Sequence, residues 1–172
     1  MPRRFLPLLA VALSGCGGGT APSSSANEVE IVDLRGIEQA LSARKGSACL
    51  LNFWATWCPP CVAELPDLVE VGREYEPRGG RILGVSFDLL IPDVERGEVT
   101  DMVSAFLAAR DLELPVLIYD APDYEAINER FDLPGGIPVT LAFDRDGKLV
   151  DRQTGAASRA RFAEMMRRAL GS

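Results

Sequence analysis

The stretch LLNFWATWCPPCVAELP (residues 50–66) decides the fold that we expect for this chain. It opens with a continuous apolar run, which is typical of a strand buried on both faces, and it continues with the spacing of a helix. Between the two lie Trp57, two cysteines spaced i, i+3 and two adjacent prolines. We therefore expect a strand over 49–55, a turn that carries the cysteines, and a long helix that ends near Tyr75.

The cysteines and prolines fit the start of that helix. Pro59 and Pro60 would occupy its first two positions, where a missing N–H costs no hydrogen bond and the fixed φ is already helical. Cys58 would lie at the positive end of the helix dipole, which favours its thiolate and makes it the expected nucleophile. Because the prolines have no N–H groups, mainly the amide of Cys61 remains to stabilise that thiolate. We therefore expect a less strongly lowered Cys58 pKa than a donor-rich pair would give, and a pair that acts as a reductant.

Strand and helix patterns alternate outward from this segment. The expected strands cover 29–34, 81–87, 115–120, 139–143 and 148–153. The expected helices cover 37–44, 99–109, 124–131 and 159–170. The last two strands form a hairpin about residues 144–147, and a final helix follows them. This order predicts an α/β fold with a mixed central sheet and helices on both faces.

Composition and charge exclude several classes of function. A chain of 172 residues suits one domain. The net charge of −7 argues against nucleic acid as a partner, because phosphate binding needs a basic surface. The chain has no histidine, which excludes a Ser-His-Asp or Cys-His nucleophile and a His-ligated zinc or haem. The acidic loop 88–101 lacks the ligand spacing and central glycine of an EF-hand, so we expect it to be solvated.

The N-terminal residues have the pattern of a secretory signal. Two arginines precede an apolar run over 5–13 that is too short to span a bilayer, and Leu-Ser-Gly-Cys follows, ending at Cys16. This ending resembles the lipobox of bacterial lipoproteins, whose cysteine is lipidated and holds the protein on a membrane surface. Ordinary signal cleavage nearby and a retained apolar tail are the alternatives. The expected organisation is a lipoprotein signal peptide over 1–15, the lipidated cysteine with a flexible Gly/Ser-rich linker over 16–27, and a globular domain over 28–172.

Residues 50–66 resemble the active-site segment of the TlpA/ResA-like branch of the thioredoxin superfamily, the membrane-associated thiol-disulfide oxidoreductases. The resemblance implies a thioredoxin-like fold with an inserted αβ unit. It also implies that Cys58 attacks a substrate disulfide and that a buried Cys61 resolves the mixed disulfide. Glu64, one helical turn after Cys61, would tune the thiols and handle protons, since Asn52 stands where classical thioredoxins keep a buried aspartate. The alternative for Glu64 is a surface carboxylate.

The segment GGIPVT (residues 135–140) carries the second part of the resemblance. Thioredoxin-like proteins have a cis proline beside the cysteines here, which makes Pro138 the expected cis proline. Ile137 would then offer its backbone N–H and C=O to an extended substrate segment. An ordinary trans proline that opens an edge strand is the alternative. Trp57 is expected to shield the active site and contact the substrate.

Other residues near these motifs are expected to be structural. Trp54 should pack in the core, and Pro66 should kink the long helix because it removes one intrahelical hydrogen bond. Cys49 should be a buried free thiol that packs as a small hydrophobic side chain. One departure from the family is the start of the domain, where the first strand passes directly into a helix in place of the family's opening hairpin.

These observations predict an enzyme: a monomeric, lipid-anchored, extracytoplasmic thiol-disulfide oxidoreductase that reduces protein disulfides without a cofactor or resident metal. The resemblance implies substrates such as the haem-binding cysteines of apocytochromes c or the cysteines of a copper centre, with a membrane thiol transporter as the electron donor. A disulfide-forming oxidant, a copper carrier that uses Cys58 and Cys61, and a peroxidase are the alternatives. A copper carrier calls for an exposed Met or His as a third ligand, and histidine is absent.

Overall fold

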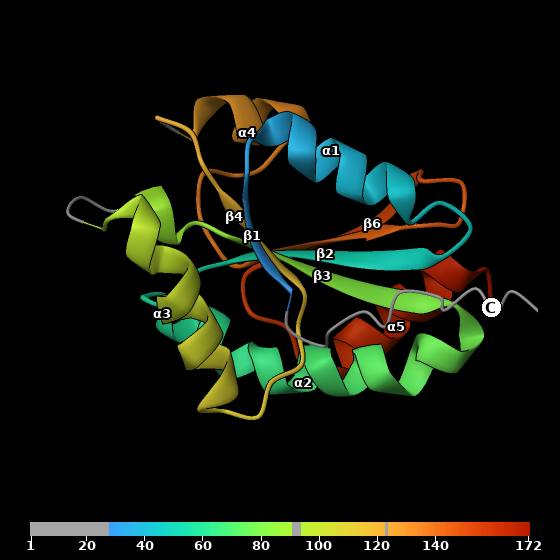
Figure 1. Cartoon of the computed structure of the whole chain (residues 1–172). Helices are drawn as coiled ribbons and strands as arrows, with labels where there is room; N and C mark the ends of the chain where they lie inside the picture. The colour runs from blue at the N-terminus through green and yellow to red at the C-terminus, as the bar shows by residue number, and fades with distance from the viewer. Residues whose placement is uncertain (1–27, 91–93, 123) are drawn as a thin grey trace, which may run out of the picture.

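A computed structural model describes residues 28–90, 94–122 and 124–172. The predicted signal peptide, Cys16 and the linker lie outside this part of the chain. No helix within it has the length and apolar character needed to cross a membrane. Its elements, labelled in Figure 1, are β1 (Val29–Val32), α1 (Leu34–Ala43), β2 (Ala48–Trp54), α2 (Pro59–Tyr75), η1 (Glu76–Arg78), β3 (Gly80–Ser86), η2 (Asp88–Leu90), α3 (Arg96–Ala108), β4 (Val116–Tyr119), α4 (Glu125–Phe131), β5 (Val139–Phe143), β6 (Leu149–Thr154) and α5 (Arg159–Leu170).

The six strands form one mixed sheet with the order β1-β4-β3-β2-β5-β6. The pairs β1/β4, β4/β3 and β3/β2 are parallel, while β5 is antiparallel to both β2 and β6. The inserted αβ unit that was predicted is α3 with β4, because β4 lies between β1 and β3 in the sheet. The parallel and antiparallel pairs together confirm the predicted mixed sheet.

Helices cover both faces of the sheet. Figure 1 shows α1 and α4 on one face and α2, α3 and α5 on the other. Two neighbouring residues of β2 point to these opposite layers: the ring of Phe53 contacts Phe131 of α4, and the ring of Trp54 contacts Phe106 of α3. This alternation is what a strand buried on both faces requires.

The first helix begins three residues earlier than predicted. Asp33 caps it, because its side chain accepts a hydrogen bond from the backbone N–H of Gly36 at 2.9 Å. The cap also ends β1 at Val32, so β1 passes directly into α1 as the sequence indicates. The apolar spacing had placed the start at Ile37, the one fully buried residue of this helix.

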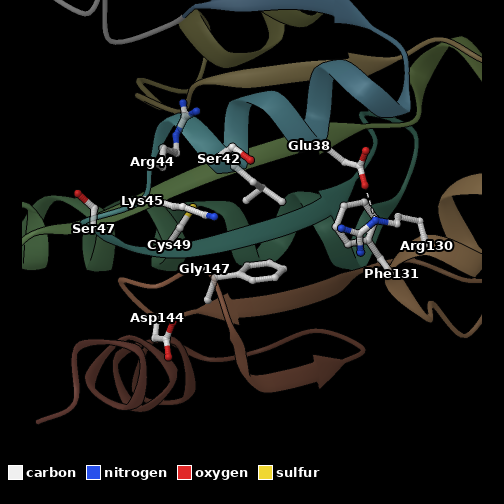
Figure 2. A pocket seen from close by; sticks show the side chains of 12 residues that line it. Glu38, Ser42, Arg44, Lys45, Ser47, Cys49, Arg130, Phe131, Asp144 and Gly147 are labelled. Carbon is white, nitrogen blue, oxygen red and sulfur yellow. Dashed lines mark hydrogen bonds and ion pairs between the residues drawn. The ribbon is translucent and has the colours of Figure 1, made fainter.

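A cavity of about 380 Å³ lies between α1, α4 and the turn of the β5–β6 hairpin, and Cys49 is among its lining residues (Figure 2). Cys49 is a free cysteine that is only 2% exposed, which confirms the predicted buried thiol. Burial raises its pKa to about 12, so the group stays protonated and unreactive at neutral pH.

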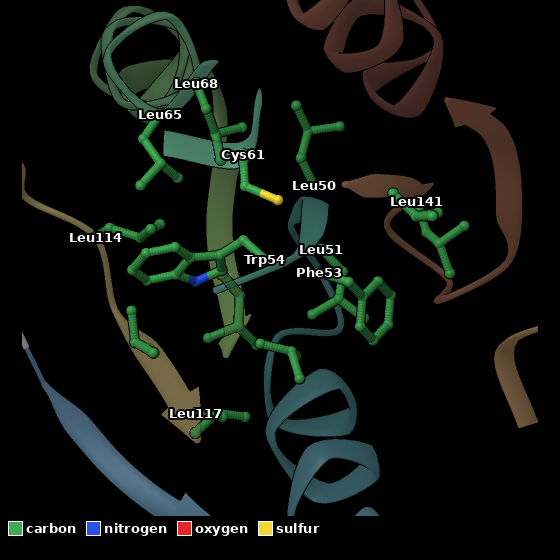
Figure 3. Packing of buried hydrophobic residues seen from close by; sticks show 14 of the residues in the cluster. Leu50, Leu51, Phe53, Trp54, Cys61, Leu65, Leu68, Leu114, Leu117 and Leu141 are labelled. Atoms are coloured by element: carbon green, nitrogen blue, oxygen red, sulfur yellow. The ribbon is translucent and has the colours of Figure 1, made fainter. Parts of the chain in front are cut away.

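The core follows β2, whose seven residues are all buried. Figure 3 shows Trp54 beside Cys61, Leu65 and Leu68 of α2, while Phe53 points to the opposite side. The indole of Trp54 lies against Gly84 of β3, where a Cβ would stand 2.8 Å from Trp54 Nε1, so the close contact requires glycine. This packing fixes the end of β2, and the cysteines follow that end directly.

Candidate active site

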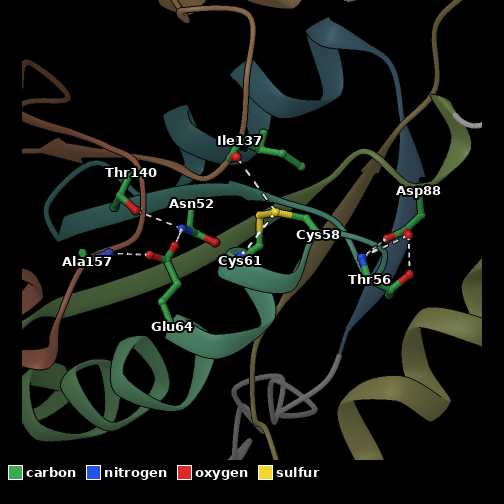
Figure 4. Close-up of a disulfide and its surroundings, with 9 residues drawn as sticks. All are labelled: Asn52, Thr56, Cys58, Cys61, Glu64, Asp88, Ile137, Thr140 and Ala157. Atoms are coloured by element: carbon green, nitrogen blue, oxygen red, sulfur yellow. Dashed lines mark hydrogen bonds between the residues drawn. A yellow bond between two sulfur atoms is a disulfide. The ribbon is translucent and has the colours of Figure 1, made fainter.

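Cys58 and Cys61 form a disulfide at the start of α2, with their Cα atoms 5.3 Å apart (Figure 4). Cys58 is the N-cap residue of the helix, and Pro59 and Pro60 are its first two residues, as predicted. Cys58 is 5% exposed and Cys61 is fully buried. Cys58 is therefore the sulfur that a partner can reach, and Cys61 can only react with Cys58 from within the protein.

Few donors surround the sulfur of Cys58. The first turn of α2 supplies the backbone N–H of Cys61, which lies 3.4 Å from Cys58 Sγ. Pro59 and Pro60 have no N–H to add. A thiolate formed at Cys58 on reduction would thus receive one N–H from this turn together with the helix dipole.

The backbone before Pro138 faces the disulfide. The Ile137–Pro138 peptide bond is cis, which confirms that prediction. The carbonyl oxygen of Ile137 lies 3.9 Å from Cys58 Sγ; in the disulfide this sulfur carries no hydrogen, whereas the reduced thiol has one to donate. The structure thereby brings together the two segments on which the resemblance rests.

An apolar groove of about 410 Å³ adjoins Cys58. Trp57, which is 43% exposed, forms part of its wall, and Ile137 lies at its side. The wall also includes Phe87, Tyr124 and Asn128, which come from distant segments and are not among the predicted site residues. Burial and the charge of Asp88 raise the pKa of Tyr124. The groove has the size and apolar character to take a side chain of a protein segment bound at Cys58.

Glu64 is buried, with 3% of its surface exposed, so it is not the surface carboxylate of the alternative interpretation. Its Oε1 accepts a hydrogen bond from Asn52 Nδ2 at 2.8 Å, and its Oε2 accepts one from the backbone N–H of Ala157 at 2.7 Å. Burial raises the pKa of Glu64, although both hydrogen bonds act in the opposite direction, and the charge of Asp67 raises it further. Glu64 can therefore hold a proton more readily than an exposed glutamate can.

The expectation of a solvated acidic loop over 88–101 is wrong in two respects: Asp88 is buried, and α3 already begins at Arg96. Glu95, Glu98 and Asp101 are exposed, but Asp88 is fully buried, and Asp93 lies outside the described residues. The carboxylate of Asp88 accepts hydrogen bonds from the backbone N–H of Thr56 at 3.1 and 3.2 Å, from the Thr56 hydroxyl at 2.5 Å and from the Ser86 hydroxyl at 2.6 Å. These donors replace water and hold the backbone two residues before Cys58 (Figure 4).

Within the described ranges, no three His, Cys, Asp or Glu side chains gather closely enough to hold an ion. The chemistry that the arrangement supports directly is exchange between a dithiol and a disulfide.

Comparison with known proteins agrees with this chemistry. Residues 18–152 match the model of the AhpC/TSA family. The chain is 32% identical over 139 residues to the thiol-disulfide oxidoreductase ResA of Geobacillus kaustophilus, covering 81% of this chain and 72% of the relative. It is 29% identical over 148 residues to the thioredoxin-like protein YneN of Bacillus subtilis, covering 86% and 80%.

Solved structures give the same result. A thiol:disulfide interchange protein of Chlorobium tepidum matches with a TM-score of 0.61 and 30% identity over 76% of this chain and 84% of that one. The exposed lipoprotein thioredoxin Etrx1 of Streptococcus pneumoniae matches with a TM-score of 0.59 and 26% identity over 74% and 88%. The chain therefore belongs to the AhpC/TSA family, and it is a thioredoxin-like thiol-disulfide oxidoreductase whose redox pair is Cys58 and Cys61.

Proposed function

We propose that this protein is a membrane-anchored, extracytoplasmic reductant of protein disulfides. The proposed direction of electron flow rests on the surroundings of Cys58 Sγ. A pair becomes a strong oxidant when its reduced, thiolate form is stabilised, and a reductant when it is not. Here the first turn of α2 offers one N–H, at 3.4 Å, and two prolines replace further donors.

The buried carboxylates on both sides of the active-site turn also disfavour a thiolate at the cysteine pair. Glu64 lies one helical turn after Cys61, and Asp88 binds the backbone of Thr56. A negative charge nearby disfavours a second one, so each ionised carboxylate disfavours a thiolate at the pair. Both features support a disulfide that is stable relative to its dithiol, which is the property of a reductant.

The proposed reaction transfers two electrons from the dithiol to the substrate. The Cys58 thiolate attacks a substrate disulfide, so that a Cys58–substrate S–S bond forms and one substrate thiolate leaves. Cys61 then loses its proton and attacks Cys58 Sγ, which forms the Cys58–Cys61 disulfide and releases the second substrate thiolate. Glu64 is the group proposed to take the proton of Cys61. Trp57 and Ile137 would contact the bound substrate segment.

The reduction potential of the pair tests the direction. The full-length protein is equilibrated with thiol/disulfide buffers of known potential, quenched with acid, and its free thiols are counted by mass spectrometry. A potential at or below that of thioredoxin, about −270 mV, is expected. A potential near −120 mV, the range of DsbA, would show a disulfide-forming oxidant and overturn the proposal.

The location is proposed from the N-terminal residues. The apolar run and the Leu-Ser-Gly-Cys ending favour lipidation of Cys16, and one structural relative is described as an exposed lipoprotein. The partners would then be protein disulfides outside the cytoplasm, such as those of apocytochromes c, and a membrane thiol transporter as the electron donor. Cys16→Ala should move the protein from the membrane fraction to the soluble one, and its persistence in the membrane fraction would refute the anchor.

A further inference from the structure

The side-chain amide of Asn52 is only partly paired. Asn52 is fully buried in β2, and its Nδ2 donates to Glu64 Oε1 at 2.8 Å and to Thr140 Oγ1 at 2.9 Å. Its Oδ1, in contrast, receives no hydrogen bond from any described residue. Buried acceptors are rarely left without a donor, so this oxygen calls for an explanation.

The direction of the amide follows from its partners. The Glu64 carboxylate needs a donor, so Nδ2 must face it and Oδ1 must face the other way. Figure 4 shows the oxygen of Asn52 turned from Glu64 towards Cys61. Asn52 lies two residues from both Leu50 and Trp54 on the side of β2 that faces α2, where Cys61 and Glu64 are one turn apart.

In the disulfide, Cys61 Sγ carries no hydrogen and offers nothing to this oxygen. Reduction adds a proton to the sulfur, and because Cys61 is fully buried, any acceptor for that S–H lies inside the protein. We propose that Asn52 is a positioning residue for Cys61: its Oδ1 accepts a hydrogen bond from the Cys61 thiol in the reduced enzyme, while its Nδ2 holds Glu64.

The amide of Asn52 thus links the Cys61 thiol to the Glu64 carboxylate, the two groups between which the proposed proton transfer takes place. An acceptor beside a thiol favours the protonated sulfur over the thiolate, so Asn52 keeps Cys61 protonated and oriented until Cys58 carries the substrate. The other groups that face this network are the Thr140 hydroxyl of β5, the Ala157 N–H and the charge of Asp67. The inference rests on the proposed role of Cys61 as the resolving cysteine, but not on the direction of electron flow.

The first test follows the side-chain carbonyl carbon of Asn52 by NMR in the isotope-labelled full-length protein. On reduction, a new hydrogen bond to Oδ1 should move this resonance downfield. Asn128, which lines the groove on α4, is the internal control, and its carbonyl carbon should move less. In Cys61→Ala, the reductant should leave the Asn52 resonance in place. An Asn52 resonance that moves no further than that of Asn128 in the wild-type protein overturns the proposal.

The second test measures the pH dependence of alkylation at Cys61 in a Cys58→Ser background, resolved by peptide mass spectrometry. Asn52→Ala should shift the midpoint of the profile about one pH unit lower, the effect of losing one hydrogen bond to the thiol form. Thr140→Val removes the other partner of Asn52 Nδ2 but keeps Oδ1, so it should leave the midpoint in place. The midpoint is informative because, unlike the absolute rate, it does not depend on how easily the reagent enters.

A double-mutant cycle separates a direct effect from one that passes through Glu64. If Oδ1 acts on Cys61 directly, Asn52→Ala still lowers the midpoint in the presence of Glu64→Gln. If the shift disappears there, Asn52 acts only by holding Glu64 and the inference is wrong. The reduction potential, measured separately, tests the proposed reductant role, so either claim can fail without the other.

Discussion

Replacing Asp88 tests whether a buried carboxylate holds the backbone ahead of the cysteines. Asp88→Ala would leave three groups without their acceptor, namely the Thr56 N–H, the Thr56 hydroxyl and the Ser86 hydroxyl. A hydrogen bond to a charged acceptor contributes about 1.5 kcal/mol, so three would total about 4.5 kcal/mol. The half-buried Thr56 hydroxyl can turn to solvent, which leaves an expected loss of about 3 kcal/mol.

The assay is urea unfolding of the oxidised protein, followed by tryptophan fluorescence. A loss of about 3 kcal/mol is a large part of the 5–15 kcal/mol that keeps a typical domain folded, so it will be clear in the midpoint. Asp88→Asn keeps one carbonyl oxygen for the Thr56 N–H and should lose less, about 1–2 kcal/mol. Asp101→Ala, which replaces an exposed aspartate of helix α3, is the control and should change stability by under about 0.5 kcal/mol.

The test is the order of the three variants by their loss of unfolding free energy. If Asp88→Ala cost no more than Asp101→Ala, the hydrogen bonds of the buried carboxylate would not stabilise the turn. A loss confined to Asp88→Ala and partly restored by Asp88→Asn would confirm it.

Three further predictions concern other groups of the site and core. Burial raises the pKa of Glu64 above its ordinary 4.5, so the folded state binds the Glu64 proton more tightly than the unfolded state does. The stability gained from this proton is complete below pH 4.5, and it is lost as pH rises through the pKa of the folded state. Urea unfolding across this range should therefore show a fall with pH that Glu64→Gln lacks, and identical profiles would contradict it. Cys49, with a pKa of about 12, should resist iodoacetamide at pH 8 in the folded protein and react only after unfolding, as read by peptide mass spectrometry. Trp57→Ala should lower kcat/KM for a protein disulfide about tenfold while leaving reduction by dithiothreitol unchanged, because only the larger substrate reaches the groove; an equal effect on both would mean a structural role.

Local pattern was sufficient to predict most of the elements. The continuous apolar run of β2, the prolines at the start of α2 and the β5–β6 hairpin all express short-range preferences that the surrounding fold does not override. The early start of α1 shows what periodicity misses. Apolar spacing marks the residues that face the core, whereas the helix begins where Asp33 can cap a free N–H.

The groove could not be predicted in this way. Phe87 follows β3, while Tyr124 is the N-cap residue of α4 and Asn128 lies in the middle of that helix, and neither segment carries a motif. Only the sheet order places them beside Cys58, since the ends of β3 and β4 lie at the same edge as the end of β2. The wall of the groove therefore depends on the long-range pairing of β2, β3 and β4, which local residue spacing does not reveal.

The burial of Asp88 did have a signal, which lies in the register of two strands. Trp54 of β2 pairs with Ser86 of β3, so the residues two positions beyond them, Thr56 and Asp88, leave the sheet side by side. An aspartate next to a threonine and a serine at adjacent strand ends has the donors it needs to be buried. The acidic composition of residues 88–101 alone predicts exposure to solvent, and Glu95, Glu98 and Asp101 are exposed.

The distribution of buried polar groups connects the fold with the reaction. Apart from tyrosines, the buried polar or charged side chains in the described part of the chain are Asn52, Glu64, Ser86, Asp88 and Thr140. All five belong to the two hydrogen-bonded networks beside the disulfide, one reaching Glu64 and the other Thr56. Polar groups are costly to bury, so their confinement to this place indicates that the fold fixes the electrostatics of the sulfurs and leaves the rest of the core apolar. Substitutions in these networks should therefore change the reduction potential as well as stability, whereas substitutions in the apolar core, such as Leu68→Ala, should change stability alone.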